Sequence, residues 1–171
     1  MYLRVVFEIS SPQENSDMDD KWLQEQADRI TRDVANKNLT DEKFIESQKL
    51  KRELAPGLWR EMKDWLREAC EGLNKQVGHE VARFIELSGN EVTIAGKEQG
   101  MYVTMIVSFD PQRLEIKYES QGGDPSAKFH IAIKSNGAAG LTDRPDFPVS
   151  IKGPTEVGKT IIHYATQVSK Y

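Results

Sequence analysis

The sequence predicts an α+β domain: an antiparallel meander sheet of about five or six strands, covered on one face by two helices, with an N-terminal strand and a two-helix extension. Two observations support this class. Apolar residues recur at helical steps of three and four up to about residue 76, and from Val81 onward they alternate with polar ones. Short connections join the alternating segments, and such connections place consecutive strands antiparallel.

The first elements are a short strand and a weakly apolar helix. Residues 3–9 alternate between apolar and polar side chains, which predicts a strand. A helix follows over roughly 17–36, with the narrow apolar stripe Leu23, Ala27, Ile30 and Val34. Such a helix, which also carries Trp22, needs a neighbour to be stable, either the protein's own sheet or another chain.

Two further helices are predicted before the sheet. One starts at Thr40 and runs to about residue 54, because Leu39 and Phe44 have the spacing of a hydrophobic staple. Pro56 is expected to lie in the first turn of the next helix. That helix, over about 57–76, has the broadest apolar stripe of the chain and is the best candidate for a core element.

The second part of the chain contains six segments with the strand pattern and one final helix. The helix is predicted over 154–169. An Asp-Pro pair at 110–111 suits a tight turn between two of the strands. The predicted strands are Phe84–Leu87, Val92–Ala95, Met101–Phe109, Leu114–Tyr118, Phe129–Ile133 and Phe147–Ile151.

Length and composition restrict the function classes. The 171 residues suit an N-terminal strand and helical arm, residues 1–55, followed by an α+β domain, residues 56–171. The net charge of −4 comes without a basic cluster, so no nucleic-acid partner is expected. There is no run of about 18 apolar residues, so no membrane span is predicted. The single cysteine, Cys70, favours a reducing, cytoplasmic location.

Residues 153–160, GPTEVGKT, match the G-x-x-x-x-G-K-[ST] pattern of phosphate-binding loops. In an alternative interpretation, Gly153, Gly158, Lys159 and Thr160 bind a nucleoside phosphate. Two observations favour an ordinary helix N-terminus instead. The preceding strands have connections too short for the crossovers of a parallel sheet. A glycine N-cap followed by a proline is also a usual way to start a helix.

The sequence predicts no catalytic residue, no metal site and no cofactor. The three histidines, His79, His130 and His163, lie in different predicted elements without ligand spacing. His130 is expected to be solvated on the polar face of its strand. Cys70 lies beside the apolar stripe of the helix over 57–76 and is expected to behave as a small apolar residue. The sequence therefore favours a protein that is not an enzyme.

Three functional hypotheses follow. The leading one is a non-catalytic cytoplasmic protein-binding or regulatory module, which self-associates or binds a protein partner through residues 1–55. One alternative is a nucleoside-phosphate-binding protein that uses residues 153–160. The other is a domain that holds a small apolar ligand between its sheet and its helices.

Overall fold

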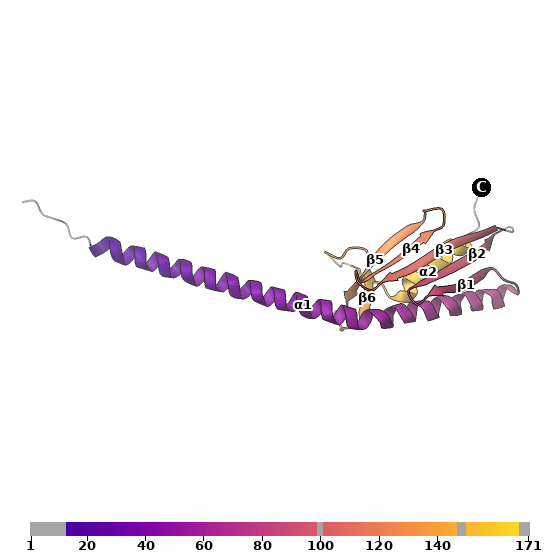
Figure 1. Cartoon of the computed structure of the whole chain (residues 1–171), viewed down its shortest axis with the longest axis horizontal. Helices are drawn as coiled ribbons and strands as arrows, with labels where there is room; N and C mark the ends of the chain where they lie inside the picture. The colour runs from indigo at the N-terminus through magenta and orange to yellow at the C-terminus, as the bar shows by residue number, and fades with distance from the viewer. Residues whose placement is uncertain (1–12, 99–100, 147–149, 168–171) are drawn as a thin grey trace, which may run out of the picture. The chain divides into compact units, whose positions relative to one another are not determined.

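The computed structural model describes residues 13–98, 101–146 and 150–167 (Figure 1). Within these residues, two helices and six strands follow in the order α1, β1 to β6, α2. The chain divides into two units, residues 1–46 and 47–171, and the second unit contains the whole sheet. The strand expected over residues 3–9 lies outside the described residues.

The second unit is built on a six-stranded sheet in the order β1-β2-β3-β4-β5-β6, and every neighbouring pair is antiparallel. The predicted α+β class and the predicted antiparallel meander are therefore confirmed. The strands are β1 (Ala82–Ser88), β2 (Glu91–Glu98), β3 (Met101–Asp110), β4 (Glu115–Ser120), β5 (Ser126–Ile133) and β6 (Ala139–Thr142).

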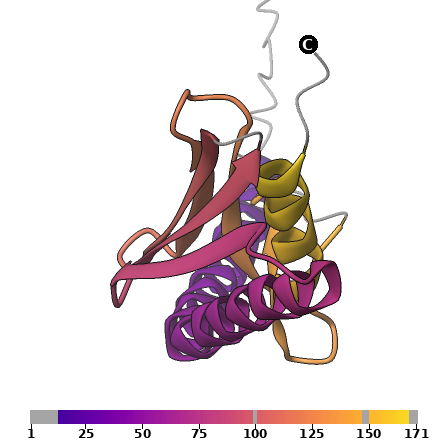
Figure 2. The ribbon, with the colours of Figure 1, turned by 90° about the vertical axis from the view of Figure 1, so that its right-hand side faces the viewer.

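The core lies between one face of the sheet and two helices, α2 (Pro154–Thr166) and the C-terminal part of α1 (Gln13–Val77), as Figure 2 shows. Cross-strand pairs such as Ile94 with Met105 place buried side chains on this face. The alternation of such residues with outward-facing ones is the period-two pattern of the sequence. The helices contribute the buried residues Ala55, Leu58, Trp59, Met62, Leu66, Cys70, Val157, Ile161, Ile162 and Ala165.

The predicted helix breaks at Thr40 and Pro56 are wrong, because residues 13–77 form one helix. Thr40 does not cap a new helix. Its Oγ1 donates a hydrogen bond of 2.9 Å to the carbonyl of Asn36, one turn back, which is how a threonine inside a helix satisfies its hydroxyl. Leu39 and Phe44, which suggested the staple, are both exposed.

Pro56 interrupts the hydrogen-bond ladder of α1 without ending the helix. Proline has no N–H, so the carbonyl of Arg52, four residues back, loses its usual partner. Pro56 and Arg52 both lie on the exposed side of α1, where water can bond to that carbonyl. On the other side, Ala55 and Leu58 are buried in the core. Packing of these residues offsets the lost hydrogen bond.

β6 was not predicted, because it lies between the predicted strands Phe129–Ile133 and Phe147–Ile151, in a segment that was expected to be a connection. A turn at Asn136-Gly137 joins β5 to β6, and Gly137 has a φ of 81°. Asn-Gly is a strong hairpin signal, so the sequence contained the information. Of the strand expected over Phe147–Ile151, residues 147–149 lie outside the described residues. Next to this segment, Lys152 forms an isolated bridge with Leu141 of β6.

Polar contacts link the edge strand β1 to α1. Glu86 accepts a hydrogen bond from Lys63 and lies 3.5 Å from Nη2 of Arg67. The hydrogen bond from Lys63 is the main reason that the pKa of the Glu86 carboxyl lies below its usual value. At the β1–β2 turn, Nε1 of Trp59 donates a hydrogen bond of 2.7 Å to the carbonyl of Gly89. These contacts orient the helix along the edge of the sheet.

Candidate functional site

Residues 21–46 of α1 (the arm helix) carry exposed apolar side chains. We define the arm seam as Leu23, Ala27, Ile30 and Val34. The side chains of Leu23, Ile30 and Val34 are 56%, 58% and 53% exposed, and Ala27 is also exposed. Grouped apolar side chains that remain in contact with water are typical of surfaces that bind another protein.

The arm seam has the spacing of a coiled-coil seam. Its residues follow one another at steps of four, three and four. At 3.6 residues per turn they fall within about 60° of the helix circumference. A stripe this narrow is typical of a helix that pairs with another helix, whereas a helix on a globular core has a wider one.

Most charged side chains of the arm helix lie away from the seam. The flanking residues are Gln24, Gln26, Thr31 and Asp33, and Asp33 alone of these four is charged. Thr31 also turns its hydroxyl inward, to the carbonyl of Ala27 at 2.8 Å. The centres of protein–protein interfaces are depleted of charged residues.

Two charged residues end the arm seam. Lys37 and Asp41 occupy the next two seam positions after Val34, at steps of three and four, and both are exposed. Apolar residues return at Phe44 and Ile45, which are exposed as well. The arm helix therefore has a short apolar stretch that is followed, at its C-terminal end, by one cation and one anion in the next two seam positions.

The phosphate-loop-like residues 153–160 form the start of α2. Gly153 is the N-cap, and its amide donates a hydrogen bond of 2.7 Å to Oε2 of Glu156. The residues from Pro154 onward are helical, so the predicted helix start is confirmed. In a phosphate loop, the backbone amides before the helix surround the anion. Here the Glu156 carboxylate occupies the place at the helix N-terminus that an anion would take.

The glycine, lysine and threonine of this pattern lie on different sides of α2. Gly158 is buried against α1, where a Cβ would lie 2.5 Å from Cε3 of Trp65. Lys159 and Thr160 are exposed, and the Thr160 hydroxyl bonds to the carbonyl of Glu156 at 3.3 Å. Nucleoside-phosphate binding stays a prediction, and this geometry gives it no support.

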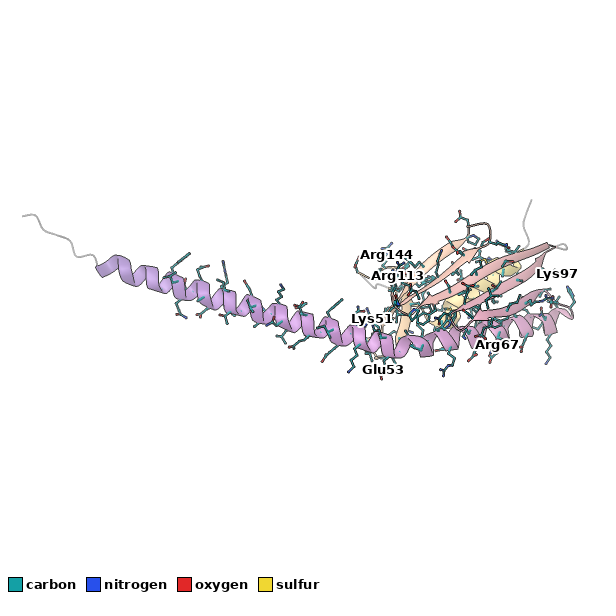
Figure 3. All side chains as sticks on the ribbon, in the orientation of Figure 1. Lys51, Glu53, Arg67, Lys97, Arg113 and Arg144 are labelled. Carbon is teal, nitrogen blue, oxygen red and sulfur yellow. The ribbon has the colours of Figure 1, made fainter. Side chains whose placement is uncertain are left out.

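A polar hollow of about 280 Å³ opens at one end of the sheet. Its lining includes Lys51 of α1, Arg113 of the β3–β4 turn, His130 of β5 and Thr142 of β6. Figure 3 shows Lys51 and Arg113 at this end, whereas Lys97 lies at the opposite end. Cationic side chains beside a hydroxyl group suit a small oxyanion. The hollow could not be predicted from the sequence, because its residues come from distant segments.

Acidic neighbours compensate much of the positive charge around the hollow. Nε of Arg113 lies 3.8 Å from Oδ2 of Asp110, and Nδ1 of the half-buried His130 lies 3.3 Å from Oε1 of Glu115. His130 is thus less solvated than its strand position suggested. Lys51 is half-buried, and in the described part of the chain its ammonium has no ion-pair or hydrogen-bond partner. The hollow therefore offers one uncommitted cation.

The other histidines do not join this group. His79 and His163 are both exposed, and His163 lies against the ring of Tyr164, with 5.9 Å between the ring centroids. Over residues 13–98, 101–146 and 150–167, no three His, Cys, Asp or Glu side chains are placed to hold a metal ion. The structure thus keeps the three histidines in separate surroundings.

Buried side chains fill the space between the sheet and its helices, where an apolar ligand was considered. Met62, Ile94, Met105 and Ile116 are fully buried there. An apolar groove of about 440 Å³ instead lies on the outside, between α1 and α2. It is lined by Trp65, Ala69, Gly72, Leu73, Gln76, Lys159, Ile162 and His163. Apolar ligand binding stays a prediction.

Cys70 lies in the core, and its thiol is poorly suited to nucleophilic chemistry. The side chain is 2% exposed. Burial, with a smaller contribution from Glu71, raises the pKa of the thiol to about 11. The nucleophile in cysteine chemistry is the thiolate. At pH 8 a pKa near 11 leaves about one thiol in a thousand ionised.

Alkylation of Cys70 by iodoacetamide at pH 8 is expected to be at least about 100-fold slower in the folded protein than in urea, because folding both buries and protonates the thiol. The rate can be followed by mass spectrometry. An exposed cysteine, Ala35→Cys in a Cys70→Ala background, should react at nearly the same rate in both states. Equal rates for Cys70 in both states would contradict its position in the core.

In the described part of the chain, no helix is long and apolar enough to cross a membrane. Comparison with protein-family models, with curated proteins and with solved structures found no match to this chain.

Proposed function

We propose that this protein is a non-catalytic protein-binding module that self-associates through its N-terminal helix. The observation that supports this proposal is the exposed arm seam, Leu23, Ala27, Ile30 and Val34. Its spacing is that of a coiled-coil seam, and its flanks are nearly free of charge.

The stability of the arm helix provides a second argument. An isolated helix gains little from its own hydrogen bonds, and most helical stability in proteins comes from packing of an apolar face. Residues 21–46 are nearly all exposed, and the hydrogen bonds of their side chains, such as Gln24 to Asp28, are local. Pairing with a second helix would supply the missing packing.

The expected association is moderate in strength. Leu23, Ile30 and Val34 are each slightly more than half exposed. Covering the remaining surface of each should contribute about 1 kcal/mol, because complete burial of such a side chain is worth about 1.5–3 kcal/mol. Association also costs translational and rotational freedom. The oligomer should therefore depend on concentration in the micromolar range or above.

Light scattering across a concentration series tests the proposal. The mass of the wild-type chain should rise above the monomer value of 19.4 kDa between about 10 µM and about 500 µM. Ile30→Glu should remain at 19.4 kDa, since pairing would bury an unpaired carboxylate in the seam.

The matched control is Ala35→Glu. It introduces the same side chain into the same exposed helix, outside the arm seam, so its mass should follow that of the wild type. A wild-type mass of 19.4 kDa at every concentration would refute self-association. Equal loss of mass in both variants would show that the seam is not the contact surface.

A further inference from the structure

We infer that two arm helices pair antiparallel, with Leu23 of one copy opposite Val34 of the other and Ala27 opposite Ile30. This inference rests on the proposed self-association and specifies its geometry. It involves only residues of the first unit. Each pair of seam residues that face each other across the two helices forms one layer of the coil. All four layers would then be apolar on both sides, and in two of them the small Ala27 would face the larger Ile30.

The charges at the end of the arm seam oppose a parallel pair. In a parallel two-stranded coil, identical residues meet in each layer. Lys37 would therefore face Lys37 of the second copy, and Asp41 would face Asp41, in successive layers of the seam. Like charges in contact repel, and exclusion of water strengthens the repulsion. The two like-charge layers would lie directly beside the apolar stretch.

The antiparallel pair separates these charges. With Leu23 opposite Val34, the two copies of Lys37 lie at opposite ends of the apolar stretch, about 25 Å apart at 1.5 Å per residue. Separations beyond about 10 Å are largely screened at ordinary salt concentration. The four apolar layers then remain contiguous, with the charged residues outside them.

Other antiparallel registers are less favourable. A shift of one heptad places Leu23 opposite Asp41 and Ala27 opposite Lys37. The carboxylate and the ammonium would then lose contact with water against apolar side chains, which is unfavourable. A longer shift could pair Lys37 with Asp41, but it would require Leu23 to contact Ala55. The side chain of Ala55 is 1% exposed and already packed in the core of its own unit. The register with Leu23 opposite Val34 is therefore the favoured one.

Disulfide trapping in the full-length chain tests this geometry. Two variants, Leu23→Cys and Val34→Cys, are oxidised separately and as an equal mixture, and the products are separated on a non-reducing gel. In the inferred pair, Leu23 lies about 16 Å along the axis from its own copy. Disulfides do not bridge Cα atoms more than about 7 Å apart. Each variant alone should therefore stay monomeric on the gel, and the mixture should form the cross-linked dimer.

The outcomes separate this inference from the proposed function. Cross-linking of each variant with itself would indicate a parallel pair, which refutes the inference and leaves self-association intact. A scattering mass above 19.4 kDa without cross-linking in the mixture would refute the register. A mass of 19.4 kDa throughout would refute self-association itself. The wild-type chain is the control, because its buried Cys70 should not cross-link.

A charge-removal variant tests the physical reason for the orientation. Lys37→Leu combined with Asp41→Leu removes both like-charge layers and extends the apolar seam. In this background, Leu23→Cys alone should begin to cross-link with itself. A parallel pair would no longer place two lysines or two aspartates face to face. If self-cross-linking stays absent in this background, the charges do not decide the orientation, and the argument from Lys37 and Asp41 is refuted.

Discussion

Gly96→Ala should lower the free energy of unfolding by about 3 kcal/mol or more. Gly96 lies in β2, at the point where α2 crosses the sheet. A Cβ at this position would lie 1.5 Å from the carbonyl oxygen of Ala165. Ala165 is buried, and the obstructing atoms belong to its backbone, so no side-chain rotation relieves the overlap. The last turn of α2 must move away from the sheet instead.

Urea denaturation measures this effect. Gly57→Ala is the matched control, because nothing lies within 4 Å of a Cβ built at Gly57 on the exposed side of α1. Alanine at this helical position should stabilise the protein by about 0.5–1 kcal/mol, so the two equivalent substitutions should have opposite signs. An unchanged denaturation midpoint for Gly96→Ala would show that α2 does not lie on β2 in solution.

Gly158→Ala should lower the free energy of unfolding by about 2 kcal/mol. The added methyl group would lie 2.5 Å and 2.6 Å from two ring carbons of Trp65. Trp65 is only partly buried, so its ring can yield more easily than the backbone at Gly96. The expected cost is therefore smaller. Urea denaturation again provides the measurement.

A double-mutant cycle with Trp65→Ala identifies the cause of this cost. Without the indole ring, the methyl group at Gly158 has space, and alanine is the better helix former by about 1 kcal/mol. Gly158→Ala should then be neutral or stabilising in the Trp65→Ala background. If its cost stays the same in both backgrounds, contact with Trp65 is not the reason for glycine at this position.

The sheet could be predicted largely from the sequence, since burial on one face imposes period two on strands such as β4. Ile116 and Tyr118 of β4, for example, are buried, and the intervening Lys117 is exposed. β6 escaped prediction because it has only four residues, three of them buried, which is too short a segment for an alternating pattern to be recognised. In that strand, pairing with β5 determines the structure more than the local pattern does.

The ends of the helices were harder to predict, because local signals compete with tertiary packing. Thr40 and Pro56 have the residue types of helix starts, yet both lie inside α1. At Thr40, a hydrogen bond to the preceding turn replaces the cap. At Pro56, burial of the neighbours Ala55 and Leu58 maintains the helix. At each of these positions the local sequence is compatible with a helix start and with a helix interior. The packing energy that decides between them cannot be deduced from the local sequence.

In the candidate sites, too, some features follow from the local sequence and others depend on tertiary contacts. The spacing of the arm seam could be read from the sequence, because it lies within one helix. The sequence did not show that Leu23, Ile30 and Val34 remain exposed, which is the observation behind the proposed function. The hollow with Lys51 and Arg113 was invisible, because only the fold brings α1 and the β3–β4 turn together.

By itself, the sequence determined the class of fold, the direction of the strands and the start of α2, because each depends on residues that are close along the chain. The tertiary structure decided that α1 continues through Thr40 and Pro56, and that Gly158 lies where a Cβ would overlap the ring of Trp65. These features depend on contacts between segments far apart in the chain. The energy of such contacts depends on how the segments pack in the folded protein, and the local sequence of either segment does not give it.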